Sequence, residues 1–126
     1  MKKVIASPDA PEAVGPYSQA IATGNLLFCA SQIPLAPETG EVVPGDVAAQ
    51  ADQVLKNLEA VLHANKMTFA NVVKTTVFLT DLADFAKMNE VYAKYFPHPY
   101  PARSTIQVAA LPKGANVEIE AIAATA

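Results

Sequence analysis

The sequence has a single cysteine, no tryptophan and only two histidines among its 126 residues. One cysteine, Cys29, cannot form a disulfide within the chain, and this is typical of proteins from a reducing compartment. The two histidines, His63 and His98, stand far apart and without clustered cysteines, so they do not form a metal-binding pattern. Gly-rich phosphate loops, the Gly-x-Ser-x-Gly elbow and the His-Glu-x-x-His motif are also absent. We therefore expect no bound metal and no chemistry that depends on these motifs.

The chain also has few charges of either sign and no long hydrophobic run. Nine basic residues are outnumbered by twelve acidic ones, which gives a net charge of −3. The basic residues are scattered, so broad attraction to nucleic acid or to anionic membranes is not expected. No apolar run approaches the roughly 20 residues of a membrane span, and the N-terminus lacks the apolar stretch of a signal peptide. These absences predict a cytoplasmic protein without nucleic-acid or membrane partners.

The chain is rich in apolar residues. Hydrophobic residues make up 52% of the sequence and charged residues only 17%. The length suits a single domain spanning residues 1–126, and a domain of this size has a large surface relative to its volume. Subunit contacts would bury the surplus of apolar side chains, so we expect an oligomer. The alternative is that alanine, which is easily exposed, inflates the count.

Hydrophobic periodicity and turn residues predict six strands and two helices. Asp46 is a plausible N-cap for the first helix, and Gly24-Asn25 has the composition of a two-residue hairpin turn. Two helices can cover only one face of the sheet, which predicts a two-layer α+β sandwich with a mixed sheet. The predicted strands are 4–5, 18–23, 26–31, 71–80, 103–109 and 116–124, and the helices are 46–65 and 81 or 84 to 96.

Polar residues alternate along the last two predicted strands. Arg103, Thr105 and Gln107 share one face of the first, and Glu118 and Glu120 share one face of the second. If these strands form a hairpin, Thr105 lies opposite Glu120 and Gln107 opposite Glu118. Both polar sets would then converge on the sheet face that the helices leave uncovered.

This polar face has two interpretations. It could be a solvated surface with ion pairs that contribute little to stability. It could also be a site, because Arg103 directly follows the Pro-rich segment 97–101 and a positioned guanidinium suits bidentate capture of a carboxylate. A glutamate across the pocket could hold a water molecule and move protons, and the residues alone do not rank Glu118 against Glu120. They indicate a carboxylate-binding α+β oligomer.

Several segments, in the same order and with nearly the same spacing, resemble the Rid family (reactive intermediate deaminases, also called YjgF) and within it the RidA group. The likeness runs essentially end to end. The combination of Pro-Ala-Arg-Ser with the closing Val-Glu-Ile-Glu strand is specific, whereas any one segment alone is weak. The matching segments are 10–11, 15–19, 32–34, 74–78, 81–82, 89, 101–104, 111–113 and 117–123.

The resemblance implies a chorismate-mutase-like fold and a homotrimer that assembles through the uncovered sheet face, with three sites between subunits and no cofactor. The implied activity is that of a 2-iminobutanoate/2-iminopropanoate deaminase. Such an enzyme hydrolyses short-lived enamines and imines, for example 2-aminoacrylate made by pyridoxal-phosphate enzymes, to 2-keto acids and ammonia. By position, Arg103 matches the carboxylate-binding arginine and Glu118 the water-positioning acid. Tyr17 and Asn89 match pocket residues, although Tyr17 could on its own account simply fill the core.

Three further substrate-binding positions depart from the family pattern. Where the family usually has Ser-Gly-Gln, this chain has Ala30-Ser31-Gln32, so a hydroxyl position is occupied by alanine and a glycine position by serine. A glycine would let the backbone approach the ligand closely. Thr105 stands where the family often has cysteine. The resemblance therefore leaves open a non-catalytic regulator that binds a keto or amino acid in the same pocket. RNA cleavage, also attached to members of the family, is disfavoured by the acidic charge.

Overall fold

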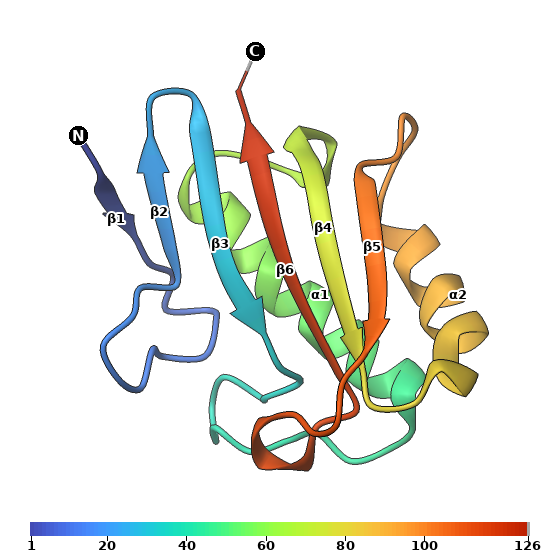
Figure 1. Cartoon of the computed structure of the whole chain (residues 1–126). Coiled ribbons are helices and arrows are strands. Elements are labelled where there is room, and N and C mark those ends of the chain that lie inside the picture. Colours follow the sequence, from blue (N-terminus) through green and yellow to red (C-terminus); the bar gives the residue numbers. More distant parts are fainter. Residues whose placement is uncertain (126) are drawn as a thin grey trace.

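The strands and helices predicted from periodicity are all present, with ends that differ by a few residues. A computed structural model describes residues 1–125. Two helices pack against one six-stranded sheet (Figure 1). The strands are β1 (Lys3–Ile5), β2 (Ala20–Thr23), β3 (Leu26–Gln32), β4 (Val72–Leu79), β5 (Ala102–Gln107) and β6 (Val117–Ala124); the helices are α1 (Val47–Ala64) and α2 (Phe85–Tyr95), and the 3₁₀ turns are η1 (Phe69–Asn71), η2 (Leu82–Asp84) and η3 (Pro112–Gly114).

The first helix begins at the predicted cap and buries the predicted stripe. Oδ1 of Asp46 accepts a hydrogen bond of 3.1 Å from the backbone N–H of Ala49, which satisfies one of the free donors of the first turn. Apolar residues spaced by three and four along α1, including Leu55, Leu58 and Leu62, are fully buried. The helix packs on β3, β6 and α2, so it fixes the central strands from which the site is built.

Two glycines before α1 allow a matched test of how the chain conformation leading into this helix affects stability. Gly45 has a φ of +119°, and a Cβ at this position would lie 2.8 Å from Cβ of Ala49. Gly40 has a φ of +71°, and a Cβ there would meet nothing within 4 Å. Both alanine variants suffer backbone strain, at about 1–3 kcal/mol each, but only Gly45→Ala adds a clash with the first turn of α1. Urea unfolding at one protein concentration should show the larger loss for Gly45→Ala, and equal losses would contradict this account.

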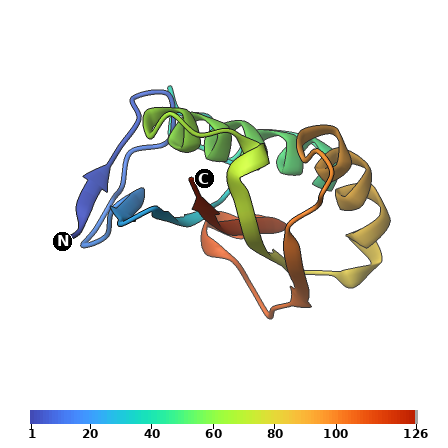
Figure 2. The ribbon, with the colours of Figure 1, turned by 90° about the horizontal axis from the view of Figure 1, so that it is seen from above.

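The two helices cover one face of the sheet, as predicted, and the other face is bare (Figure 2). The strand order is β1-β2-β3-β6-β4-β5. The β4-α2-β5 segment is a crossover unit, and β5 lies parallel to β4 at the edge of the sheet. The last strand, β6, lies antiparallel between β3 and β4. The sheet is therefore mixed. We call the bare side the open face.

The predicted hairpin between the last two strands is wrong. β4 separates β5 from β6, with Thr75 paired to Arg103 on one side and to Ala121 on the other. Thr75 and Ala121 are buried under the helices, so Arg103 points to the helix side, and Thr105 and Gln107 follow it there. Gln107 Oε1 accepts a hydrogen bond of 2.9 Å from the backbone N–H of Leu82, just before α2.

The two glutamates of β6 lie on the other side of the sheet. Val117, Ile119 and Ala121 are buried under the helices, while Glu118 and Glu120 alternate with them and point to the open face. This part of the prediction is correct. The polar sets of β5 and β6 therefore do not converge within one subunit, because the two strands are not neighbours and the shared register with β4 places them on opposite faces.

Candidate functional site

One cavity forms where the edge strand β5 meets α2. It has a volume of about 470 Å³. We call it the arginine pocket. It brings together two predicted site residues, Arg103 and Asn89, because β5 carries one and the facing side of α2 carries the other. Its lining residues are Asn89, Tyr92, Ala93, Tyr100, Pro101 and Arg103.

Aromatic rings hold the guanidinium of Arg103 in place. Its Cζ lies 4.7 Å from the centroid of the Tyr92 ring and 5.4 Å from that of Phe85, which are cation–π distances. The Tyr92 hydroxyl lies 2.8 Å from Oγ1 of the buried Thr75, so this ring is anchored to β4. Burial raises the pKa of Tyr92, and the phenol stays protonated at neutral pH. The guanidinium is thus oriented before any ligand arrives.

Arg103 has no carboxylate partner within residues 1–125. The two ion pairs of this part of the chain join Lys56 to Asp52 and Lys87 to Asp46, and neither involves Arg103. An oriented guanidinium without an acidic partner retains its capacity for two parallel hydrogen bonds to a carboxylate. This arrangement suits an anionic ligand and adds to what the sequence indicates for Arg103.

A second cavity, of about 590 Å³, lies on the side of Glu118. We call it the acid pocket. It gathers four of the five remaining site candidates, Tyr17, Ala30, Ser31 and Glu118, from the N-terminal segment, β3 and β6. Tyr17 is 55% exposed, so it does not fill the core. The other lining residues are Pro11, Glu12, Val14, Gln32, Ile33, Leu35, Pro112 and Lys113.

The surroundings of Glu118 favour its protonated form. Burial raises the pKa of this carboxyl most strongly, a hydrogen bond from the Ser31 side chain lowers it, and the charge of Glu120 raises it. The net direction is upward. A carboxyl whose pKa moves toward neutrality can both accept and return a proton near the working pH.

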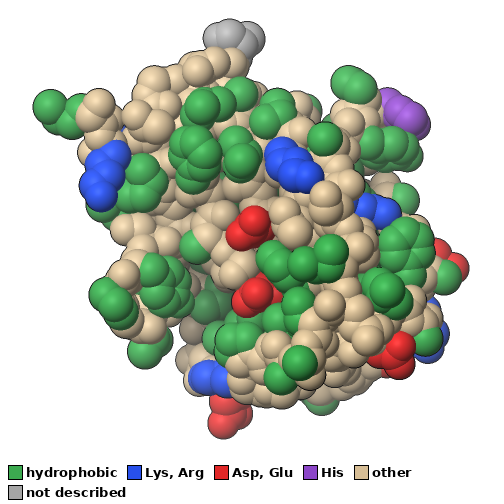
Figure 3. Space-filling model, in the orientation of Figure 1, with side chains coloured by type: hydrophobic (Ala, Val, Ile, Leu, Met, Phe, Trp, Pro, Cys, Tyr) green, Lys and Arg blue, Asp and Glu red, His purple; other side chains and the backbone are tan. Residues whose placement is uncertain are grey.

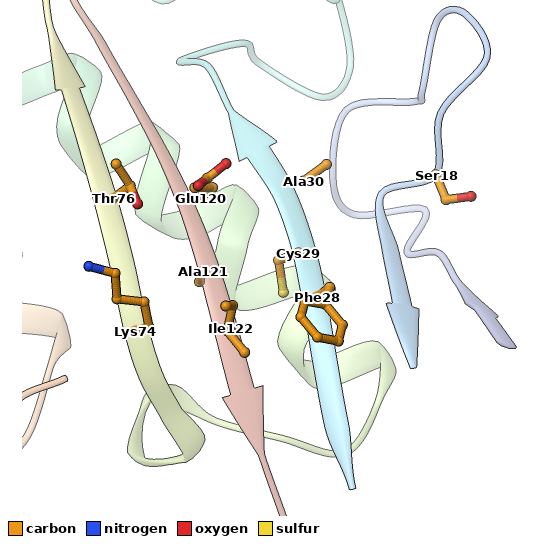
Figure 4. Close-up of a pocket in the computed structure, with 9 residues that line it drawn as sticks. All are labelled: Ser18, Phe28, Cys29, Ala30, Lys74, Thr76, Glu120, Ala121 and Ile122. Atoms are coloured by element: carbon orange, nitrogen blue, oxygen red, sulfur yellow. The ribbon is translucent and has the colours of Figure 1, made fainter. Parts of the chain in front are cut away.

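Glu120 lies in a different hollow of the open face. Figure 3 shows acidic and basic side chains surrounded by hydrophobic ones on this face, and Figure 4 shows the hollow itself, of about 370 Å³. Here Lys74 donates a hydrogen bond of 3.1 Å to Oγ of Ser104. Glu120 shares this hollow with Lys74, whereas Glu118 shares the acid pocket with Tyr17 and Ser31. The structure thus separates the two glutamates that the sequence did not rank. The lining residues are Ser18, Phe28, Cys29, Ala30, Lys74, Thr76, Glu120, Ala121 and Ile122.

The last candidate, Thr105, and the single cysteine have distinct surroundings. Thr105 follows Arg103 on the helix side of β5, where its Oγ1 is buried and lacks a hydrogen-bond partner within the described chain. It lines neither pocket. Cys29 is 6% exposed, and burial raises the pKa of its thiol to about 12, so at neutral pH it is a protonated core residue rather than a nucleophile.

Neither the aromatic platform under Arg103, formed by Phe85 and Tyr92, nor Lys113 was predicted from the sequence. Phe85 and Tyr92 flank Asn89 at spacings of four and three and so share its side of the helix. That spacing was the available signal. Lys113 lines the acid pocket from η3, where its φ of 57° is left-handed. No sequence pattern marks a lysine for this conformation.

Residues 1–125 include no helix long and apolar enough to cross a membrane. In the same range, no group of three or more His, Cys, Asp or Glu side chains is placed to hold a metal ion.

The fold and its two polar pockets define a two-layer α+β protein with room for small-molecule ligands. The chain belongs to the family described as endoribonuclease L-PSP, whose model matches residues 7–125. This is the Rid, or YjgF, family that the sequence resembles, so that prediction is confirmed. The family includes proteins named as deaminases of reactive intermediates.

Similar proteins span nearly all of the chain. Reactive intermediate deaminase A, chloroplastic, from Arabidopsis thaliana is 55% identical over 122 residues, which are 97% of this chain and 65% of the plant protein. The protein named 2-iminobutanoate/2-iminopropanoate deaminase from Mus musculus is 50% identical over 123 residues, covering 98% of this chain and 91% of the mouse protein. The crystal structure of E. coli TdcF with bound serine matches with a TM-score of 0.93 at 46% identity, covering 98% of this chain and 99% of that one.

Proposed function

We propose that this protein hydrolyses short-lived enamines and imines of small carboxylic acids, such as 2-aminoacrylate, to 2-keto acids and ammonia. The observation that carries the proposal is the unpaired guanidinium of Arg103 on its aromatic platform. Two relatives that share half or more of the sequence are named as deaminases of this kind. The serine bound to TdcF is an amino acid of similar size to the proposed substrate, with a carboxylate.

The complete site needs two subunits. Arg103 points to the helix side of the sheet and Glu118 to the open face, so one subunit does not bring them to the same ligand. We propose that the open face of one subunit packs near the edge strand β5 of the next and that three subunits form a homotrimer. Exposed apolar side chains on the open face, among them Phe28 at 43% and Ile106 at 44%, support burial of this face.

The proposed reaction assigns a role to each pocket. Arg103 binds the substrate carboxylate through two hydrogen bonds, with Asn89 beside it in the arginine pocket. The enamine tautomerises to the imine, and water attacks the imine carbon while Glu118 takes a proton from that water. Glu118 passes that proton to the imine nitrogen, which gives a carbinolamine. Glu118 then moves the hydroxyl proton to the nitrogen as the C–N bond breaks, and the products are ammonia and a 2-keto acid. No oxidant or reductant takes part, because the substrate is already activated.

The remaining candidates shape the substrate cavity. Tyr17, Ala30 and Ser31 line the acid pocket with Glu118, and we propose that Tyr17 and Ala30 contact the part of the substrate remote from its carboxylate. Thr105 follows Arg103 on the same side of β5, and within the described chain its buried hydroxyl has no hydrogen-bond partner. The substitutions that place serine at 31 and threonine at 105 tune the choice of substrate in this proposal.

The alternative is a non-catalytic regulator that binds a keto or amino acid in the same pocket. Turnover separates the two, since a regulator binds without consuming its ligand. The family description as endoribonuclease raises RNA as a third substrate, but a net charge of −3 offers little attraction to a polyanion.

The proposal is tested by generating 2-aminoacrylate in situ, with a pyridoxal-phosphate dehydratase acting on serine. Its decay is followed with and without the protein, and with Glu118→Gln as the matched variant that removes the base but keeps the shape. Wild type should accelerate the decay and the variant should not. A folded oligomer that binds a keto acid but leaves the decay rate unchanged would favour the regulator.

A further inference from the structure

We propose that Ser31 is a positioning residue for Glu118: its hydroxyl donates a hydrogen bond to the carboxylate and holds one of its oxygens, so that the other faces the attacking water. This inference rests on the proposed function and extends it to a residue that departs from the family pattern, since the family usually has glycine at this position. A glycine there would have no side-chain donor for the carboxylate.

A β-bulge aims Ser31 at the acid pocket. Cys29 pairs with Ala121 and Gln32 pairs with Ile119, so two residues of β3 stand opposite the single residue Glu120 of β6. In regular alternation the residue two positions after Cys29 would share its buried side. The bulge breaks that alternation, and Ser31 lines the acid pocket together with Glu118.

The proposed hydrogen bond would oppose two other influences on the carboxyl. Burial and the charge of Glu120 raise the pKa of Glu118, whereas the Ser31 hydroxyl lowers it. Ser31 therefore increases the ionised fraction of a base that its other surroundings push toward the protonated form. A hydroxyl does this without a charge of its own, so it does not compete with Arg103 for the substrate carboxylate.

The charged and titratable groups around Glu118 come from each element that lines the acid pocket. The N-terminal segment contributes Glu12 and Tyr17, and η3 contributes Lys113. Lys113 donates a hydrogen bond of 2.8 Å to the carbonyl of Gly40, which ties its ammonium to the neighbouring loop. β6 contributes Glu120, which shares its own hollow with Lys74 of β4.

The test is a direct titration of the Glu118 carboxyl by carbon-detected NMR in the intact oligomer, alongside the pH dependence of 2-aminoacrylate decay. Ser31→Ala should raise the pKa of Glu118 and move the acidic limb of the activity profile to higher pH, since it removes the lowering influence. Ser31→Thr keeps the hydroxyl, so the pKa of Glu118 and the acidic limb of the activity profile should stay close to those of wild type. Glu120→Gln should lower the pKa of Glu118 and move the acidic limb to lower pH, because it removes a negative charge that raises this pKa.

The two readouts separate this inference from the proposed function. If the titration of Glu118 is the same in wild type and Ser31→Ala, the inference is overturned, whatever the activity. A variant whose decay rate falls by the same factor at every pH would also overturn it, because that pattern indicates direct substrate contact or packing. If the titrations shift as expected but no variant or wild type turns over aminoacrylate, the Ser31–Glu118 contact stands and the proposed reaction fails.

Discussion

Replacing Arg103 by alanine is expected to lower kcat/KM for imine hydrolysis by roughly one and a half to three and a half orders of magnitude. The substrate carboxylate would lose a bidentate charged partner in a partly desolvated pocket, a loss worth about 2–5 kcal/mol, and each 1.4 kcal/mol is about a factor of ten. Arg103→Lys keeps the charge but loses the planar guanidinium and its stacking on Tyr92. Its kcat/KM should therefore lie between those of wild type and Arg103→Ala. Steady-state decay assays at several enzyme concentrations measure the effect.

The matched control for this loss is Lys56→Ala. Lys56 is an exposed cation on α1 that pairs with Asp52 and lies outside both pockets. Its removal changes the net charge as Arg103→Ala does but should leave kcat/KM unchanged. An equal loss in the two variants would indicate that general charge attracts the substrate, and would contradict a specific role for Arg103.

Mixing two inactive variants is expected to restore activity. If Arg103 and Glu118 of one site come from different subunits, a mixed oligomer of Arg103→Ala and Glu118→Ala chains contains some sites with both residues intact. Random assembly from equal amounts leaves about one quarter of the sites unaltered in a closed ring of identical chains. Co-refolding the two variants should therefore return about a quarter of wild-type activity, measured against each variant refolded alone.

The outcome depends directly on the strand order. If Arg103 and Glu118 served one site within a subunit, every mixed site would lack one of the two, and co-refolding would return nothing. The same result would follow if subunits did not exchange, so mass spectrometry of the mixed oligomers is the control. If mixed oligomers form but regain no activity, the proposal that Arg103 and Glu118 of one site come from different subunits is contradicted.

The elements of this fold could be predicted because their local signals agree. The buried stripe of α1, the cap at Asp46 and the alternation of Val117 and Ile119 with the glutamates depend only on neighbours in sequence. Strand order depends on long-range pairing. The hairpin prediction assumed that strands consecutive in sequence are neighbours in the sheet. Residues 72–107 instead have the order strand, helix, strand, which favours a parallel crossover.

The site was predicted less completely than the fold, for the same reason. Arg103 could be singled out because a guanidinium that follows a Pro-rich segment suits capture of a carboxylate, and Glu118 because of the resemblance. The placement of Ser31 in the same pocket as Glu118 could not be predicted, since it depends on a bulge that has no glycine or proline to mark it. The grouping of residues into two pockets also required the sheet register.

The opposite orientations of Arg103 and Glu118 bear on the symmetry of the proposed assembly. A two-fold dimer joins one patch to itself, so it would have to bring the edge strand β5 and the open face into a single interface. If each interface instead joins one β5 edge to one open face, the contacts run head to tail and each one completes a single site. A ring closed in this way has as many complete sites as subunits and leaves no half-site exposed, whereas an open chain of any length has one unmatched arginine pocket at one end and one unmatched acid pocket at the other.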